Sequence, residues 1–231
     1  EAALAEHAIR VTPEQVNAVR GASKRQAILQ LVPAGPDRQQ FAERAYTSFK
    51  EQLAQRFKAG VRAIDGAERA FAWLRERGAR VALNTGFDRD ITALLVSALH
   101  WDQGQVDAVV CGDDVSRGRP APQLIFRCME ATNATSVRDV AVVGDTALDL
   151  QAGHNAGVRW SIGVLSGAHQ RTQLEKQPHT RLIASVAELP AVFGELTAES
   201  QVVKSQAAAE EQFEWGTLRW LCNASLVPGA E

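Results

Sequence analysis

Two aspartates stand one helical turn apart directly after a short apolar segment. Val140–Val143 is typical of a strand buried on both faces of a parallel sheet, and Gly144 then permits a tight turn before Asp145 and Asp149. Ligands of open α/β sheets bind outside the carboxyl ends of the strands, and carboxylates placed there suit a hard cation such as Mg²⁺. Because Asp145 could equally cap the helix that follows, the spacing leaves metal binding and helix capping both open.

Residues suited to phosphate binding follow other predicted elements. Asn84, Thr85 and Gly86 come after the expected strand Val81–Leu83, where a hydroxyl, an amide and glycine N–H groups can hold phosphate oxygens. Arg119 is followed by a proline, and a guanidinium can bind phosphate through two parallel hydrogen bonds. The alternatives are an ordinary strand-to-loop turn at 84–86 and a solvated arginine at the start of a helix.

Composition narrows the class of protein. The 231 residues are 45% hydrophobic, enough for one large domain or two small ones, and the formal net charge is −2 without a basic block. A nucleic-acid partner is therefore not indicated, and because no apolar run is long enough to cross a bilayer, no membrane contact is expected. The three scattered cysteines form neither a disulfide framework nor a zinc pattern, which favours the reducing cytoplasm.

The expected elements divide the chain into three parts. Residues 1–60 carry helix signals without a strand signal, including capping boxes at Thr12–Gln15 and Ser23–Gln26, and are predicted to form a helical cap domain. Residues 61–193 alternate strands with helices, which predicts an α/β core with a parallel, Rossmann-like sheet. Its strands are expected at 80–83, 106–111, 140–143, 159–164 and 182–184.

Residues 194–231 fit neither part and stay unassigned. A polar, alanine-rich stretch at 201–212 is followed by Trp215, Leu218, Trp220 and Leu221. This segment could form a helix that docks through its tryptophans, or a poorly ordered tail. It is also the one unassigned apolar stretch that could supply a further strand if the predicted sheet lacks one.

Taken together, these motifs resemble the haloacid dehalogenase-like superfamily of phosphohydrolases. The fourth motif of that family, GDxxxD, is matched by Gly144, Asp145 and Asp149, and the second, a strand ending in a phosphate-binding Ser or Thr, is matched by Asn84-Thr85. The third motif is a cation before a helix, usually lysine and here Arg119. The resemblance covers roughly residues 1–193 and implies a Rossmann-like core with a helical cap.

A narrower resemblance is to the phosphonatase-like clade, which includes phosphonoacetaldehyde hydrolases. There arginine replaces lysine within a GRPxP context, as in Gly118–Pro122. Phosphonatases use a cap lysine that forms a Schiff base with the aldehyde. The matching GxxK segment is Gly21–Lys24, but Ala27 replaces the histidine expected one turn later. The resemblance implies a substrate-binding Lys24 and leaves Schiff-base chemistry and a solvated lysine both open.

The first motif of the family has no match in this sequence. It is an apolar strand followed by an aspartate that attacks the phosphoryl group and also binds Mg²⁺. Asp88–Thr92 has the letters DxDxT, but it follows a glycine-containing segment, and Asp90 leads into a helix as a cap would. We expect one of three situations: a segment before Glu1, another segment that fills the gap, or a degraded relative.

The resemblance therefore implies a Mg²⁺-dependent hydrolase of a small phosphorylated or phosphonate substrate, acting through an aspartyl-phosphate. The metal would be bound by Asp145. The catalytic residues would be Arg119, Thr85 and Asp149. The substrate would be bound by Asn84, Thr85, Gly86, Arg119 and Lys24. A phosphatase or mutase acting on sugar phosphates stays open, and a homodimer is an option for the assembly. The alternative, which the missing nucleophile favours, is a catalytically inactive relative that binds a phosphorylated ligand or another protein.

Overall fold

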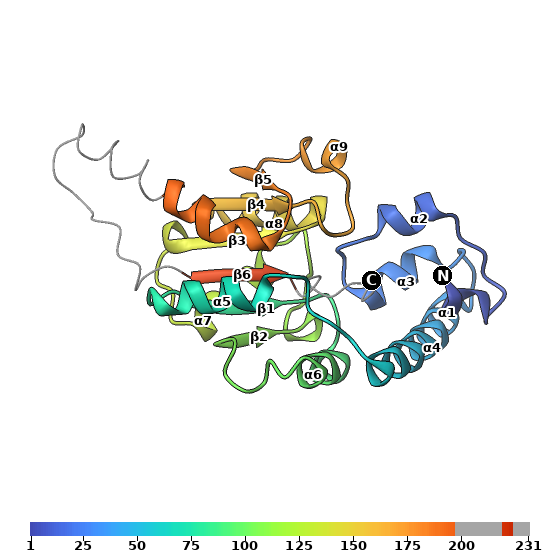
Figure 1. The fold of residues 1–231 in the computed structure, drawn as a ribbon. Helices are drawn as coiled ribbons and strands as arrows, with labels where there is room; N and C mark the ends of the chain where they lie inside the picture. The colour runs from blue at the N-terminus through green and yellow to red at the C-terminus, as the bar shows by residue number, and fades with distance from the viewer. Residues whose placement is uncertain (197–218, 224–231) are drawn as a thin grey trace.

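The N-terminal helices form a unit that packs beside an α/β core in this computed structural model, which describes residues 1–196 and 219–223 (Figure 1). These helices are α1 (Ala2–Ala5), α2 (Pro13–Ala18), α3 (Lys24–Leu31) and α4 (Arg38–Ala59). Residues 1–60, all of them described, contain no strand, as the sequence predicted.

Local hydrogen bonds explain where two of these helices begin. Thr12 and Gln15 form the predicted capping box at α2. At α3 the Ser23 hydroxyl accepts a hydrogen bond from the Gln26 amide, which is half of the predicted box. Buried apolar residues of α3 and α4, among them Ile28 and Tyr46, then hold the unit together.

The core is built on a six-stranded parallel sheet in the order β2-β1-β6-β3-β4-β5. The strands are β1 (Arg80–Asn84), β2 (Ala108–Val110), β3 (Val140–Gly144), β4 (Trp160–Val164), β5 (Arg181–Ile183) and β6 (Arg219–Asn223). The helices of the core are α5 (Ala67–Glu76), α6 (Arg89–Ala98), α7 (Gln123–Ala131), α8 (Ala147–Ala156) and α9 (Arg171–Leu174). The α/β class, the parallel sheet and all five predicted strands are confirmed, although β2 is shorter than expected.

Alternate residues of the inner strands pack on opposite faces of the sheet. Val81 and Leu83 of β1 join an apolar cluster that includes Phe71 of α5, whereas Ala82 joins a second cluster that includes Leu124 of α7. Every residue of β3 is buried. Apolar side chains therefore cover both faces, which explains why the segment at 140–143 is apolar throughout.

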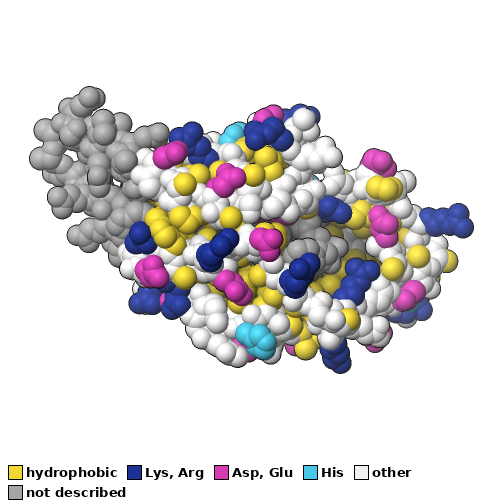
Figure 2. Space-filling model, in the orientation of Figure 1, with side chains coloured by type: hydrophobic (Ala, Val, Ile, Leu, Met, Phe, Trp, Pro, Cys, Tyr) yellow, Lys and Arg dark blue, Asp and Glu magenta, His cyan; other side chains and the backbone are white. Residues whose placement is uncertain are grey.

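The surface shows no large patch of one charge on the face drawn in Figure 2, where basic and acidic side chains are interspersed. Across the described segments, the helices are too short or too polar for any of them to cross a membrane.

The C-terminal strand β6 occupies the middle of the sheet. It pairs with β1 over five residues, from Arg80↔Arg219 to Asn84↔Asn223, and with β3 over four. Within the described residues β1 and β3 have no direct pairing, so β6 joins the two halves of the sheet. The prediction that the tail fills a gap is thus confirmed for 219–223, and a docking helix is wrong for Trp220. Trp215 and the stretch 201–212 lie outside the described residues.

A polar contact fixes the cap helix α4 against the core helix α6. The Tyr46 hydroxyl donates to Asp88 Oδ2 at 2.7 Å, and Lys50 Nζ lies 3.4 Å from the same oxygen. Burial and this hydrogen bond raise the pKa of Tyr46 above its usual range. Asp88 also accepts the Ile91 amide and caps α6, so the predicted cap at Asp90 is wrong by two residues, because α6 begins at Arg89.

One carboxylate fastens the start of β1 to the loop before β2. Asp107 accepts the Val81 amide at 2.8 Å and pairs with Arg80 at 2.9 Å and Arg75 at 3.3 Å. Burial opposes ionisation of this group, but the amide and the two guanidinium groups outweigh it and lower the pKa of Asp107.

We expect the contribution of Asp107 to stability to disappear in acid. Because its pKa is lower in the folded than in the unfolded state, the contribution is complete above the unfolded pKa of about 4 and is lost as pH falls through the folded pKa. Asp107→Asn should lower the free energy of unfolding by about 1 kcal/mol at pH 7, and by less towards pH 3. Urea unfolding of both proteins across this range measures the difference, and a constant difference would contradict the linkage.

Proline at the centre of β6 should break the sheet between β1 and β3. Leu221→Pro removes an N–H donor from a strand that is paired on both sides, and we expect a loss of about 3 kcal/mol in the free energy of unfolding. Leu221→Ala is the matched control, since it keeps the amide. If the two variants unfold at the same urea concentration, β6 contributes nothing through its backbone.

Candidate active site

A buried ion pair lies where the cap meets the carboxyl ends of the strands. Arg119 Nε is 2.8 Å from Asp149 Oδ1, and both side chains are at most 4% exposed. The other two guanidinium nitrogens donate to the cap and to β1. Nη1 donates to the Gly21 carbonyl at 3.2 Å. Nη2 donates to the Asn84 carbonyl at 3.1 Å and also to Asn84 Oδ1. Arg119 therefore joins three parts of the chain and is not the solvated arginine that was the alternative from sequence.

The second oxygen of Asp149 is held by Thr146. Asp149 Oδ2 accepts the Thr146 hydroxyl at 2.6 Å and the Thr146 amide at 3.0 Å, in a capping box at the start of α8. The cap of α8 is thus Thr146, and the alternative that Asp145 caps this helix is wrong. Asp149 orients Arg119, and both of its oxygens have partners in the protein.

Asp145 lies at the end of β3, enclosed by the loop after β4. Its Oδ2 accepts the Ala168 amide at 2.7 Å, and its carbonyl accepts the His169 amide at 3.1 Å. A Cβ at Gly167 would lie 2.1 Å from Oδ2, so the loop can approach this closely only with glycine at that position. His169 in turn accepts the Ala147 amide through Nδ1, which holds the loop on the first turn of α8.

The carboxylate of Asp145 fits one kind of metal site. Among the described residues, no three His, Cys, Asp or Glu side chains gather in a way that could hold a metal by themselves. Mg²⁺ commonly takes one or two carboxylates and completes its shell with waters and substrate phosphate oxygens. A single buried carboxylate at the carboxyl ends of parallel strands suits that arrangement. It does not suit a metal site made of protein ligands alone.

The predicted phosphate-binding segment lies at the end of β1. Thr85 is buried; its amide donates to the Val110 carbonyl, and its hydroxyl accepts the Phe87 amide at 3.1 Å. A Cβ at Gly86 would lie 2.7 Å from the Ala22 carbonyl, so the cap backbone sits directly on this residue. The segment is therefore both a turn and a cap contact, and its hydroxyl keeps a proton that it can donate.

The cap segment 20–24 covers the site. Arg20 donates to the Ala168 carbonyl at 3.4 Å, and the Lys24 amide donates to the Gly86 carbonyl at 3.1 Å. A Cβ at Gly21 would lie 2.4 Å from Thr146 Oγ1, which requires glycine there, with its positive φ of 86°. The segment thus touches the loop beside Asp145, the start of α8 and the end of β1.

The side chain of Lys24 lies over an aromatic ring. Its Nζ is 5.4 Å from the ring centroid of Phe87, a cation–π arrangement. Lys24 also lines a cavity of about 450 Å³ together with Arg20 and Arg56. Lys24 is half-buried, so it is not the fully solvated lysine of the alternative reading.

The structure brings some of the predicted site residues together. Arg119 contacts both Asn84 and Asp149, and the Lys24 amide contacts Gly86, whereas Asp145 lies on the far side of β6 from Thr85. Sequence reasoning missed Thr146, Gly167 and Ala168. The T-x-x-D spacing of Thr146 and Asp149 could have revealed the first, but no local pattern marks the loop that encloses Asp145.

The fold is an α/β core with a helical unit packed over polar side chains at the carboxyl ends of its strands, and comparisons identify the family. Residues 1–164 match the family described as haloacid dehalogenase-like hydrolase. The chain therefore belongs to the haloacid dehalogenase-like hydrolase family. This confirms the resemblance to the family that its motifs indicated.

Curated relatives and solved structures agree with this membership. A phosphonoacetaldehyde hydrolase of Parabacteroides distasonis is 32% identical over 136 residues, which are 59% of this chain and 51% of the relative. A phosphonoacetaldehyde hydrolase of Bacillus cereus is 30% identical over 132 residues, which are 57% of this chain and 50% of the relative. The chain thus spans about half the length of these relatives. A crystal structure of a phosphonoacetaldehyde hydrolase-like protein from Oleispira antarctica shares the fold, with a TM-score of 0.71 and 20% identity over 84% of this chain and 83% of that one.

Removing one partner of the buried ion pair should be costly. Arg119→Met leaves the Asp149 carboxylate buried beside an apolar side chain, and we expect a loss of about 3–5 kcal/mol in the free energy of unfolding. The double variant Arg119→Met/Asp149→Leu should recover part of it, because no buried charge remains unpaired. Arg127→Met, which breaks an exposed pair with Glu130, is the control and should cost under about 1 kcal/mol. Equal losses for Arg119→Met and the control, in urea unfolding, would contradict this assignment.

Proposed function

We propose that this chain binds the phosphoryl or phosphonyl group of a small substrate, with Mg²⁺, between the cap and the carboxyl ends of β1 and β3. One observation carries the proposal. Arg119 is buried and held by Asp149 and Asn84 at the cap–core junction, and the buried carboxylate of Asp145 follows β3 in the other half of the sheet. A buried cation held in this way is suited to an anionic ligand.

Three side chains would hold the phosphoryl oxygens. The Thr85 hydroxyl can donate a hydrogen bond, and Asn84 and Arg119 lie beside it at the end of β1. Arg119 also donates to the Gly21 carbonyl, a contact at 3.2 Å that a phosphoryl oxygen could replace when the cap moves. In the transition state the fixed charge of Arg119 would stabilise the negative charge of the transferring group without reorganisation.

Asp145 would hold the metal. When bound, Mg²⁺ would neutralise charge on the phosphoryl oxygens and fix their position. The Ala168 amide at 2.7 Å keeps the Asp145 carboxylate in one orientation, as supporting hydrogen bonds do at metal sites.

Hydrolysis through an aspartyl-phosphate requires a nucleophilic carboxylate between Thr85 and Asp145. In this chain that position in the sheet belongs to β6, which ends at Asn223, and no aspartate or glutamate lies within 219–223. We therefore propose phosphoryl binding for the residues of this chain, and turnover for a protein that presents an aspartate at that place. The inactive, ligand-binding alternative corresponds to binding without turnover.

Lys24 would contact the leaving group of the substrate, which is the part that separates from the phosphoryl group. Its Nζ lies over the ring of Phe87, and its backbone amide donates to the Gly86 carbonyl. We propose substrate binding for it, with a phosphonate or a phosphomonoester as the substrate class. Borohydride trapping with phosphonoacetaldehyde would reveal an imine at Lys24.

A reducing compartment such as the cytoplasm fits the buried free thiols of Cys111 and Cys128. Burial raises the pKa of the Cys128 thiol to about 12.

The metal assignment predicts a specific loss. Asp145→Asn should weaken Mg²⁺ binding in the presence of inorganic phosphate by at least about 10–100-fold, because the carboxylate proposed to bind the metal becomes a neutral amide. Calorimetric titration measures the Kd, and Asp90→Asn, whose carboxylate is 86% exposed, is the control. Phosphate release from phosphonoacetaldehyde and several phosphomonoesters is followed in parallel. Unchanged Mg²⁺ binding in Asp145→Asn would overturn the assignment.

A further inference from the structure

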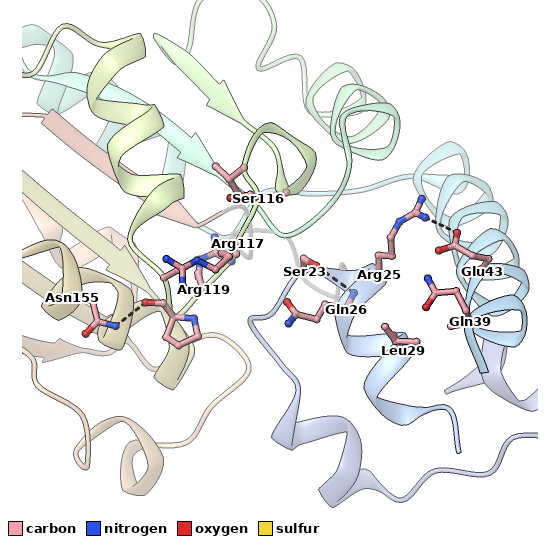
Figure 3. Close-up of a pocket in the computed structure, with 16 residues that line it drawn as sticks. Ser23, Arg25, Gln26, Leu29, Gln39, Glu43, Ser116, Arg117, Arg119 and Asn155 are labelled. Carbon is pink, nitrogen blue, oxygen red and sulfur yellow. Dashed lines mark hydrogen bonds and ion pairs between the residues drawn. The ribbon is translucent and has the colours of Figure 1, made fainter. Parts of the chain in front are cut away.

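A cleft of about 650 Å³ continues from Arg119 along the junction of cap and core (Figure 3). On the core side it is lined by the loop 115–121 and by Asn155 of α8, and on the cap side by residues of α3 and α4. Its volume lies in the range of sites for small molecules. Neither Asp145 nor Thr85 lines it, so it extends beyond the proposed phosphoryl site.

The core wall of this cleft is fixed by hydrogen bonds at both ends. The Gln123 side chain, through Oε1, accepts the Arg117 amide at 2.7 Å and contacts the Ser116 hydroxyl at 3.1 Å. At the other end, Asn155 donates to the Pro120 carbonyl at 2.8 Å. The backbone that carries Arg117 therefore has a defined position before any ligand binds, which limits the entropy lost on binding.

The cap wall is fixed as well. Arg25 Nη1 lies 2.5 Å from Glu43 Oε2, and its guanidinium carbon lies 4.8 Å from the ring centroid of Tyr46. Gln26 and Gln39 add amide side chains to this wall, and Figure 3 shows Gln26 on the side that faces the core. The wall thus offers hydrogen-bond donors and a cation whose direction is set by α4.

The charges of the lining do not cancel. Arg119 is paired with Asp149 and Arg25 with Glu43, but among the described residues no carboxylate lies within ion-pair distance of Arg117. Arg117 is exposed and stands two residues from Arg119 on the fixed loop. The cleft therefore carries an excess positive charge next to the phosphoryl site.

We propose that this cleft binds a second anionic group of the substrate, a carboxylate or a phosphate, with Arg117 as its principal partner and Arg25 opposite. The proposal rests on the proposed function, because one ligand must reach from Arg119 into the cleft. It narrows the substrate class to phosphonates or phosphomonoesters that carry a second acidic group. Arg117 then determines specificity and takes no part in the chemical step.

The test compares two series of probes, in Mg²⁺, by calorimetric titration. Alkylphosphonates of two to five carbons carry one anionic group, and ω-carboxyalkylphosphonates and alkylene bisphosphonates of the same lengths carry two. We expect one length of the second kind to bind about 10–100-fold more tightly than its alkylphosphonate, as for a hydrogen-bonded ion pair. Arg117→Gln should remove that advantage and leave alkylphosphonate binding unchanged. Arg127→Gln, on the exposed side of α7, is the matched control and should change neither.

The outcomes separate the cleft from the phosphoryl site. If alkylphosphonates bind and the second anionic group adds nothing at any length, the cleft proposal is wrong and the proposed function stands. If the doubly charged probes bind equally well without Mg²⁺, and Arg117→Gln abolishes their binding, the cleft holds an anion and the proposed function is wrong. If neither series binds to a folded sample, both are wrong.

Discussion

The buried pair of Arg119 and Asp149 is the contact on which the arrangement of the site depends. Removing two charges from water is unfavourable unless further hydrogen bonds satisfy them. Here Thr146 satisfies the carboxylate, while Asn84 and the Gly21 carbonyl satisfy the guanidinium. One ion pair therefore fixes the first turn of α8, the end of β1 and the cap loop relative to one another.

A second constraint is the continuity of the sheet through β6. Thr85 and Asp145 follow β1 and β3, and these strands are two strand spacings apart, about 10 Å, because β6 lies between them. Under the proposed function, a phosphoryl group has to bridge that gap, because Asp145 would hold Mg²⁺ on one side of β6 and Thr85 would bind an oxygen on the other. The strand in the middle thus sets the width of the site, whichever residues it carries.

The sequence predicted what local patterns determine. Apolar runs such as Val140–Val143 and capping signals such as Thr12–Gln15 depend on neighbouring residues, and they predicted the strands, the helical N-terminal segment and the parallel sheet correctly. Contacts between distant residues were beyond reach: the close approach of Gly21 to Thr146 and the bond from Tyr46 to Asp88 leave no periodic pattern. The strand β6 was open from sequence because its place depends on two partner strands and not on its own residues.

The contacts of Arg119 also tie ligand binding to the position of the cap. Its Nη1 donates to the Gly21 carbonyl, so under the proposed function an incoming phosphoryl oxygen competes with a cap backbone group for the same donor. The cap is also held by Tyr46 and Lys50 of α4, which both contact Asp88, and these contacts do not involve the ligand. Exchange at Gly21 can therefore shift the loop 20–24 while α4 stays in place. Since Lys24 in that loop is the first residue of α3 and the next residue, Arg25, lines the cleft, such a shift would alter the phosphoryl site and the cleft together.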